Sequence, residues 1–226
     1  MDKKLDSASR IILTGATGMV GEGVLHECLQ HGGVEEVLVI GRKPCGIIHP
    51  KLKEIIHADF YDLSSIEEQL KGYNACFFCA GVSSIGKKEP EFYRLTHTMT
   101  LHVAQTLVKQ GPPMIFCYIS GRGTDSTEQG RTMWARVKGL TENDLMKLPF
   151  KHVYNFRPGV LSPTKGLKNT LSFYKYMGWL VPVIRALSPK SICSLEQLGK
   201  AMINSVTKGY EKQILEVKDI LMLSER

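Results

Sequence analysis

The stretch that decides the fold is Ile11-Ile12-Leu13-Thr14-Gly15-Ala16-Thr17-Gly18-Met19-Val20-Gly21. A short apolar run leads into three glycines that recur at every third position, and an amphipathic segment then continues from Met19 to Gln30. This order predicts a strand, a tight turn and a helix. Gly15 lets the chain turn sharply at the end of the strand, and Gly21 lets the helix lie close to the strand.

The same turn predicts a binding site for a diphosphate. Gly18 has no Cβ to keep a phosphate from the backbone, and the free N–H groups at the start of the helix lie at the positive end of its dipole. This is the dinucleotide-binding fingerprint, with the spacing G-x-x-G-x-x-G in place of the G-x-G-x-x-G of ordinary dehydrogenases. The alternative interpretation is a tight turn that holds no ligand.

Length, composition and charge bound the class of protein. With 226 residues of ordinary composition, the chain is expected to form one α/β domain, residues 1–226, in which 161–226 make a small C-terminal lobe. The first residues lack the apolar core of a signal peptide, no apolar run is long enough to span a bilayer, and the six cysteines are scattered as reduced thiols are. These features predict a cytoplasmic protein. The net charge of +7 favours an anionic ligand, whereas no motif supports nucleic-acid binding.

Apolar runs alternate with helical patterns along the rest of the chain. The expected strands are 37–40, 52–56, 73–79, 114–119 and 153–156, and the expected helices are 64–71, 90–110, 131–147 and 195–206, with a last strand and tail at 214–223. Strands separated by helices favour a parallel sheet. The predicted fold class is therefore α/β: a Rossmann-like, doubly wound, mostly parallel sheet with helices on both faces, in three layers.

The end of the second expected strand indicates which dinucleotide binds. An NAD site usually places Asp or Glu here to accept from the ribose hydroxyls, but in this chain Gly41 is followed by Arg42 and Lys43. A guanidinium can pair with a 2′-phosphate and stack on adenine, whereas a carboxylate would repel the phosphate. The sequence therefore predicts NADP in preference to NAD, with Arg42 as the main contact and Lys43 as the second. The alternative is a solvated basic loop.

Two further strand ends are expected to border the cofactor. Asp59 and Phe60 follow the third strand, where the loop passes the adenine. Cys79-Ala80-Gly81 follow the fourth strand, where small residues let the chain pass close to the sugars.

No metal site is predicted. Cys76 and Cys79 have C-x-x-C spacing, but residues three apart in a strand point to opposite faces, which favours core cysteines over a redox or metal pair. His97 and His102 are five apart on an expected helix and do not share a face.

Together these motifs resemble the short-chain dehydrogenase/reductase superfamily, specifically its atypical and extended members, and they are similar to the small NAD(P)-binding proteins grouped with the Tat-interacting oxidoreductase. The matching pieces, in chain order, are Thr14 to Gly21, Gly41-Arg42, Asp59, Cys79-Ala80-Gly81, Ser120, Lys138 and Arg157-Pro158-Gly159. The resemblance implies that the cofactor is bound by Gly15, Thr17, Gly18, Met19, Val20, Gly21, Arg42, Lys43, Asp59, Phe60, Cys79, Ala80, Gly81, Lys138, Arg157, Pro158, Gly159 and Val160.

The resemblance also implies a catalytic set of Ser, Tyr and Lys, with the last two in Y-x-x-x-K on the helix after the fifth strand. In that set the serine orients the carbonyl, the tyrosine gives or takes the proton of the alcohol, and the lysine lowers the pKa of the tyrosine and holds the nicotinamide ribose. Ser120 and Lys138 match this pattern, but Trp134 stands where the tyrosine is expected. An indole N–H is a donor only, so Trp134 cannot act as a general acid or base.

No other tyrosine is followed by a lysine four residues later. Tyr93, Tyr118 and Tyr174 can take the tyrosine's place only if the fold brings one of them close. Trp134 itself could pack against the nicotinamide or fill the substrate pocket.

Two functions follow from these residues. The first is an NADP-dependent oxidoreductase for a small carbonyl or alcohol substrate, in which Ser120 binds the substrate oxygen, Lys138 holds the ribose, and water or an unassigned side chain carries the proton. The second is a non-catalytic protein whose binding of NADP regulates its contacts with partners. Trp134 favours the second function, and the retained Ser120 and Lys138 favour the first.

The C-terminal part and the partners are less readable. The aromatic and apolar segment 173–187 is interpreted as a lid or packed helix, with a membrane-surface element as the alternative. The resemblance implies a homodimer that pairs through the helices expected at 90–110 and 131–147.

Overall fold

The fingerprint stretch folds as the sequence predicts in the computed structural model, which describes residues 8–110, 113–164, 166–169 and 192–226. Strand β1 (Ser9–Thr14) leads into helix α1 (Met19–Gln30). Gly15 has a φ of +76°, and a Cβ there would lie 2.7 Å from the carbonyl oxygen of Cys79. A Cβ on Gly21 would lie 2.1 Å from the carbonyl oxygen of Gly15. Both positions therefore require glycine, one for its backbone angle and both for close approach.

Seven parallel strands form one sheet in the order β3-β2-β1-β4-β5-β6-β9. The remaining strands of this sheet are β2 (Val34–Gly41), β3 (Leu52–Ile56), β4 (Ala75–Phe78), β5 (Ile115–Ile119), β6 (His152–Arg157) and β9 (Ile214–Glu216). The order runs outward in opposite directions from the adjacent strands β1 and β4, which is the definition of a doubly wound sheet. The predicted fold class is confirmed, and the switch point lies at the carboxyl ends of β1 and β4.

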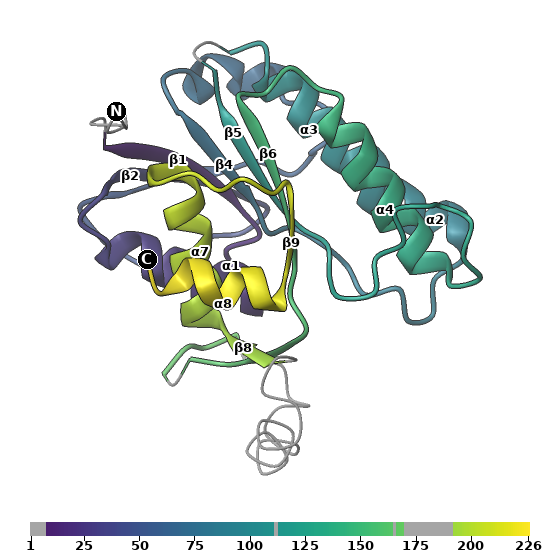
Figure 1. Ribbon diagram of the computed structural model, residues 1–226. Helices are drawn as coiled ribbons and strands as arrows, with labels where there is room; N and C mark the ends of the chain where they lie inside the picture. Colours follow the sequence, from purple (N-terminus) through teal and green to yellow (C-terminus); the bar gives the residue numbers. More distant parts are fainter. Residues whose placement is uncertain (1–7, 111–112, 165, 170–191) are drawn as a thin grey trace.

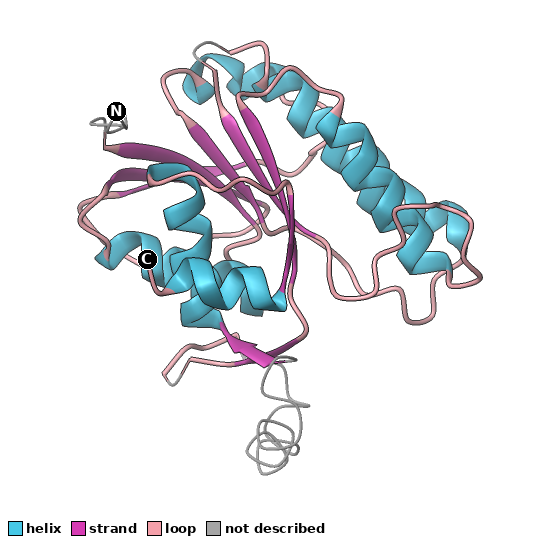
Figure 2. Cartoon of the chain, viewed as in Figure 1, coloured by secondary structure: helices cyan, strands magenta, loops and turns pink. Residues whose placement is uncertain are grey.

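Helices cover both faces of the sheet (Figures 1 and 2). Helices α1, α7 (Leu195–Thr207) and α8 (Val217–Ser224) lie on one face, and α3 (Met99–Leu107) and α4 (Met133–Met146) lie on the other. Side chains of each strand alternate between the two cores: Phe77 belongs to the cluster under α1, and Cys76 and Phe78 belong to the cluster under α3. Each fully buried side chain of this size contributes roughly 1.5–3 kcal/mol to folding.

Three elements differ from the sequence prediction. The helix expected at 90–110 is α2 (Glu89–Tyr93), a π-helical turn η2 (Arg94–Thr98) and α3, in one continuous run. The expected strand and tail at 214–223 are strand β9 and helix α8, which begins with reciprocal hydrogen bonds between Glu216 and Asp219. A short parallel pair, β7 (Val160–Ser162) and β8 (Ile192–Ser194), has no counterpart in the prediction.

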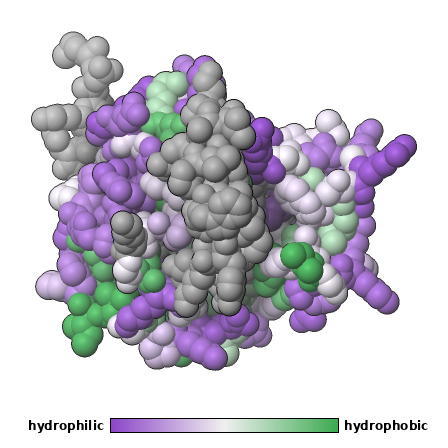
Figure 3. Space-filling model, turned by 90° about the horizontal axis from the view of Figure 1, so that it is seen from below, coloured by the Kyte–Doolittle hydropathy of each residue, from purple (hydrophilic) through white to green (hydrophobic). Residues whose placement is uncertain are grey.

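The remaining described segment with helical character is the 3-10 helix η1 (Ser64–Leu70) between β3 and β4. Hydrophilic residues cover most of the described surface in the view of Figure 3. The described helices all fall short of the length and hydropathy that a membrane-crossing segment needs. The segment 173–187, interpreted above as a lid or a membrane-surface element, lies outside the described residues.

Candidate functional site

A cavity of about 390 Å³ opens at the carboxyl ends of β1 to β4, next to the switch point of the sheet. Its walls come from the glycine turn, the ends of β2, β3 and β4, and the helical run on the other side. The lining residues are Gly15, Ala16, Thr17, Gly18, Val39, Ile40, Gly41, Arg42, Lys43, Ala58, Asp59, Phe60, Tyr61, Cys79, Ala80, Gly81, Val82, Leu95 and Met99. Ligands of doubly wound sheets bind at this point of the fold.

Ten of the residues predicted to bind a cofactor meet in this cavity: Gly15, Thr17, Gly18, Arg42, Lys43, Asp59, Phe60, Cys79, Ala80 and Gly81. The predicted residues Met19, Val20, Gly21, Ser120, Lys138, Arg157, Pro158, Gly159 and Val160 do not line it. Met19, Val20 and Gly21 form the first turn of α1, which begins at the cavity wall. Ser120 and the residues that follow β6 lie at the same carboxyl edge of the sheet, beyond β4.

The glycine turn gives the cavity a surface of backbone groups. Gly18 is the residue that precedes α1, and it offers no side chain to cap the helix. The first N–H groups of a helix have no partner within the helix, so those of Met19 and Val20 remain as donors for an anion. A Cβ at Gly18 would meet only the carbonyl oxygen of Gly15, at 3.4 Å. The turn therefore has the close-approach surface and the donors that a diphosphate requires.

The end of β2 gives the cavity its positive charge. Arg42 and Lys43 are both exposed and both line the cavity, and the strand end itself carries Gly41 in place of a carboxylate. Asp59 is the acidic residue of the lining. Its Oδ1 accepts a hydrogen bond of 2.8 Å from the backbone N–H of Tyr61, so this carboxylate also shapes the loop that it lies on.

Sequence reasoning missed one wall of the cavity. Leu95 and Met99 come from the run of η2 and α3, and Tyr61 faces them from the loop after β3. The Tyr61 hydroxyl donates to the carbonyl oxygen of Arg94 at 2.9 Å, and the Arg94 guanidinium lies 5.1 Å from the centre of the Tyr61 ring. No signal in the sequence indicated this wall, because it forms by contact between the loop after β3 and a helical run about 33 residues further along the chain.

Ser120 and Lys138 meet at the end of β5. The Lys138 Nζ donates to the backbone carbonyl oxygen of Ser120, and burial lowers the pKa of Lys138 to about 8. The Ser120 hydroxyl is buried and donates to the carbonyl oxygen of Phe156 at 3.1 Å. While it donates to Phe156, the Ser120 hydroxyl can still accept a hydrogen bond from a ligand, whereas donation to a substrate oxygen requires the O–H to rotate about the Cβ–Oγ bond.

The half-buried Trp134 occupies the position of the expected tyrosine, and its indole lies beside Gly123. A Cβ on Gly123 would be 3.5 Å from the Trp134 ring. Tyr118 is buried, and burial raises its pKa further above its ordinary value, so it holds its proton at neutral pH. Tyr93 stacks on His97 with a centroid distance of 4.5 Å, on the side of α4. Tyr174 lies outside the described residues. The described contacts of Tyr93 and Tyr118 therefore lie with His97 and with the core and α4, and include neither Ser120 nor Lys138.

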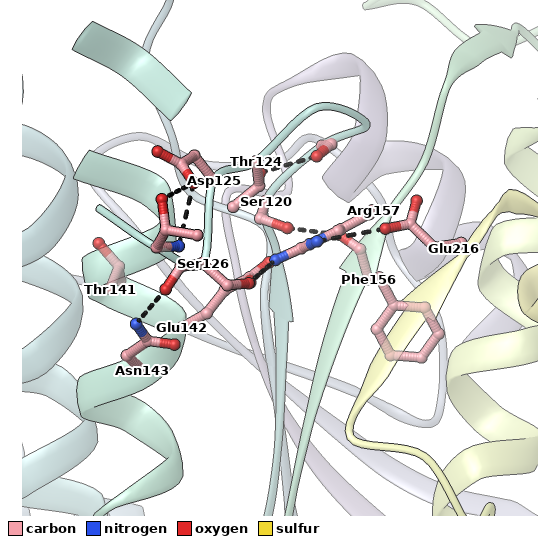
Figure 4. Close-up of polar contacts among 12 residues, drawn as sticks. Ser120, Thr124, Asp125, Ser126, Thr141, Glu142, Asn143, Phe156, Arg157 and Glu216 are labelled. Atoms are coloured by element: carbon pink, nitrogen blue, oxygen red, sulfur yellow. Dashed lines mark hydrogen bonds and ion pairs between the residues drawn. The ribbon is translucent and has the colours of Figure 1, made fainter. Parts of the chain in front are cut away.

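Arg157 has a different setting from the one expected for a cofactor-binding side chain. Its guanidinium is bound by the carboxylates of Glu142 and Glu216 and by the hydroxyl of Ser126 (Figure 4). The side chain is buried in these contacts and does not line the cavity. A cofactor contact along 157–160 thus remains a prediction for the backbone and the residues that follow Arg157.

Cys76 and Cys79 do not form a pair, and Cys79 also lines the cavity. Cys76 packs in one core and Cys79 packs against the other, and both are free thiols. Within the described ranges, His, Cys, Asp and Glu side chains form no cluster of three or more that could hold a metal ion.

Fold and cavity define a dinucleotide-binding protein of the Rossmann type. The chain belongs to the NAD dependent epimerase/dehydratase family, whose model matches residues 11–127. It is 29% identical to the rat protein HTATIP2 over 162 residues, which are 71% of this chain and 65% of the rat protein. It is 24% identical to the mitochondrial protein fmp52-1 of Aspergillus terreus over 212 residues, with 90% of each chain covered. The resemblance to atypical short-chain dehydrogenases/reductases is confirmed.

Solved structures share the fold. The Bordetella bronchiseptica enzyme WbmF in complex with NAD+ superimposes with a TM-score of 0.67 at 13% identity and covers 97% of this chain and 78% of its own. The ADP-L-glycero-D-manno-heptose-6-epimerase of Helicobacter pylori gives a TM-score of 0.66 at 15% identity over 100% of this chain and 84% of its own.

One sequence prediction is overturned by these relatives. The fungal proteins of Aspergillus terreus, Scheffersomyces stipitis and Candida glabrata are named as mitochondrial, which contradicts the predicted cytoplasmic location. The prediction was wrong because scattered thiols and a start without a secretory apolar core argue only against the secretory route. Neither feature distinguishes one interior compartment from another.

Proposed function

We propose that this protein is an NADP-dependent oxidoreductase of the atypical short-chain type that acts on a small carbonyl or alcohol substrate. The observation that carries the proposal is the cavity in which a glycine turn faces two cations at the end of β2. A site for NAD usually has a carboxylate at that strand end, and here the position is Gly41. The 2′-phosphate of NADP needs a cation, which Arg42 and Lys43 supply.

Residues of the cavity, together with neighbours at the same edge of the sheet, are assigned to the parts of this cofactor in order along the sheet. The backbone at Gly18, Met19 and Val20 would hold the diphosphate. Arg42 and Lys43 would hold the 2′-phosphate. Asp59 and Phe60 would contact the adenine. The sugars would lie against Cys79, Ala80 and Gly81, and the nicotinamide end would lie near Lys138 and 157–160.

When bound, the nicotinamide supplies or accepts a hydride. The chain's own contribution to the reaction lies at Ser120 and Lys138. Lys138 is the titratable side chain of this pair, and its Nζ can hold or release a proton near pH 8. The half-buried Trp134 packs beside Gly123 and moves no proton.

A second function is favoured by two observations. Trp134 replaces the expected tyrosine, and the Ser120 hydroxyl is already committed to the Phe156 carbonyl. Both are what a non-catalytic protein would show, in which bound NADP regulates contacts with a partner. This alternative keeps the same cofactor and differs from the first only in turnover.

The chain organisation proposed here is a single domain, residues 1–226, whose part 161–226 forms the substrate lobe. Leu161, Cys193, Leu198 and Ile220 belong to the same hydrophobic cluster as Leu13. Because that core is shared, the described C-terminal elements are not expected to fold separately from the sheet.

The cofactor assignment is tested by removing the cation that reads the 2′-phosphate. Arg42→Ala is expected to weaken NADPH by roughly 1.5–3 kcal/mol, or about tenfold to a hundredfold in Kd, and to leave NADH nearly unchanged. Isothermal titration calorimetry measures both. Lys218→Ala is the matched control, because Lys218 is exposed on α8 and does not line the cavity. Equal weakening of NADPH and NADH by Arg42→Ala would remove the 2′-phosphate assignment.

A further inference from the structure

Lys138 and Glu142 lie one turn apart on α4, yet they do not pair. Residues at i and i+4 share a helix face, and a lysine and a glutamate so spaced attract each other. Here the Lys138 ammonium donates to the carbonyl oxygen of Ser120, and the Glu142 carboxylate is turned to Arg157. The structure therefore contains a cation and an anion that are neighbours on one helix and bind different partners.

Arg157 occupies both oxygens of Glu142. Its Nε donates to Oε1 at 3.0 Å and its Nη2 donates to Oε2 at 2.5 Å, which is the bidentate arrangement that a guanidinium forms with a carboxylate (Figure 4). Glu142 is fully buried, and Arg157 is 9% exposed. A buried carboxylate without this partner would carry an uncompensated charge, so the pair is held firmly in place.

The remaining donors of Arg157 reach two other elements. Its Nη1 donates to Glu216 at the end of β9 at 3.2 Å, and its Nη2 also donates to the hydroxyl of Ser126 at 2.5 Å. Ser126 belongs to the loop that follows Ser120. The same guanidinium thus joins β6, α4, β9 and this loop.

Other contacts press the loop against α4 beside Lys138. The Asp125 N–H donates to the carbonyl oxygen of Ala135 at 3.0 Å, and the Asn143 side chain donates to the carbonyl oxygen of Ser126 at 3.0 Å. A Cβ on Gly139, the residue after Lys138, would lie 1.8 Å from the carbonyl oxygen of Asp125. The loop is therefore held tightly against α4 next to the residue that carries the lysine.

From this geometry we propose that Arg157 is a positioning residue for Lys138. By holding both oxygens of Glu142, Arg157 prevents this carboxylate from pairing with the Lys138 ammonium. The ammonium is thereby left to contact the Ser120 carbonyl and the ligand of the site. The proposal rests on the proposed function for the identity of that ligand. The arrangement of Arg157, Glu142 and Lys138 belongs to the protein without any ligand and can be tested by itself.

The charged groups around Lys138 come from several elements. Glu142 on the same helix acts to raise the pKa of Lys138, and burial, which is the larger effect, lowers it to about 8. Arg157 from β6 neutralises Glu142, and Glu216 from β9 reaches the region only through Arg157. Tyr118 from β5 stays protonated, since burial and the Glu142 charge both raise its pKa. A free Glu142 carboxylate would offset the effect of burial and raise the pKa of Lys138 above about 8.

The test measures the titration of Lys138 by NMR. Lysines are labelled by reductive methylation with ¹³C-formaldehyde, and the Lys138 signal is identified by its absence from Lys138→Met. Arg157→Met is expected to raise the pKa of Lys138 by about one to two pH units, because Glu142 turns to the ammonium. The double variant Arg157→Met with Glu142→Gln is expected to return the pKa towards that of the wild type, since the carboxylate is gone.

The double variant separates positioning from general structural damage. Damage to the fold would perturb Lys138 in the single and the double variant alike, and a folded Arg157→Met protein with an unchanged Lys138 pKa would equally overturn the proposal. If Arg157→Met does not fold, Arg157→Lys takes its place. The ammonium of the new lysine satisfies only one oxygen of Glu142, so a smaller rise in the pKa of Lys138 is expected. No rise in this pKa would overturn the proposal.

The titration needs no nucleotide, so its result stands apart from the proposed function. Calorimetry with NADPH on the same samples tests the cofactor. A Lys138 pKa that responds as described in a protein that binds no NADPH would keep the positioning role and remove the proposed function. NADPH binding with an unresponsive Lys138 would do the reverse.

Discussion

Gly21→Ala tests whether the glycine turn has the geometry that the sequence predicts. The new Cβ would lie 2.1 Å from the carbonyl oxygen of Gly15, 2.5 Å from its carbon and 2.9 Å from the backbone nitrogen of Ala16. All three atoms are backbone atoms of the turn, so none can move without moving α1 away from β1. The variant must therefore open the fingerprint to fold at all.

The expected loss of stability follows from two opposing effects. Overpacking a tight site costs roughly 1–3 kcal/mol, and contacts with rigid backbone place this site at the upper end. Alanine gains about 1 kcal/mol over glycine in a helix. The net loss is about 2 kcal/mol, which moves the midpoint of urea unfolding by about 1 M for an m-value of about 2 kcal/mol/M.

The assay is urea unfolding followed by far-UV circular dichroism, with Gly32→Ala as the matched control. Gly32 is exposed just after α1, and a Cβ there meets no atom within 4 Å. Its substitution is expected to change the free energy of unfolding by less than about 0.5 kcal/mol. A Gly21→Ala protein with the same midpoint as Gly32→Ala would refute the close contact between turn and helix.

Three further predictions concern charge, stability and assembly. Burial raises the pKa of Glu36, but hydrogen bonds from Lys53, Tyr73 and Arg10 outweigh it and lower this pKa to about 2. The ionised Glu36 therefore stabilises the fold fully above the pKa that it has in the unfolded chain. This stabilisation is lost as the pH falls through about 2. Thermal unfolding should show wild type more stable than Glu36→Gln at pH 6, with the difference shrinking between pH 4.5 and pH 2; a constant difference would contradict the assignment. Burial of the Lys138 ammonium lowers its pKa from 10.5 to about 8, which costs stability below pH 8, and that cost fades as the pH rises towards 10.5. Lys138→Met should therefore unfold at a higher temperature than wild type at pH 7 and gain less at pH 9.5, whereas an equal gain at both would point to packing alone. A homodimer through α3 and α4 predicts twice the chain mass of 25.3 kDa in analytical ultracentrifugation, and a single-chain mass at micromolar concentration would remove that prediction.

The parts of the fold that follow from local chemistry were predictable. The strand, turn and helix around Gly15 and Gly21 follow from spacing alone, and α1 has the expected bounds. The mostly parallel, doubly wound sheet follows from the alternation of strands and helices, which leaves few topologies open. Helix α8 was not predicted, because its start is capped by Glu216 and Asp219 in place of the more usual serine or threonine.

Residues of the site were predictable only where their position at the end of a single strand places them there. Arg42 and Cys79 follow strands directly, and Asp59 lies in the loop after β3, so their meeting at one edge follows from the parallel sheet. Tyr61 and Leu95 meet through contacts between segments far apart in the chain, which no local pattern records. The pairing of Arg157 with Glu142, which leaves Lys138 to Ser120, likewise depends on packing between β6 and α4.

The most direct measurement is a calorimetric titration of the wild-type protein with NADPH and, separately, with NADH. The proposed function predicts saturable binding of NADPH at one site per chain, tighter than that of NADH by about tenfold or more, as expected for a charge-assisted contact to the 2′-phosphate. Binding of NADH as tight as that of NADPH would contradict the assignment of Arg42 and Lys43, and binding of neither would contradict the assignment of the glycine turn to a dinucleotide.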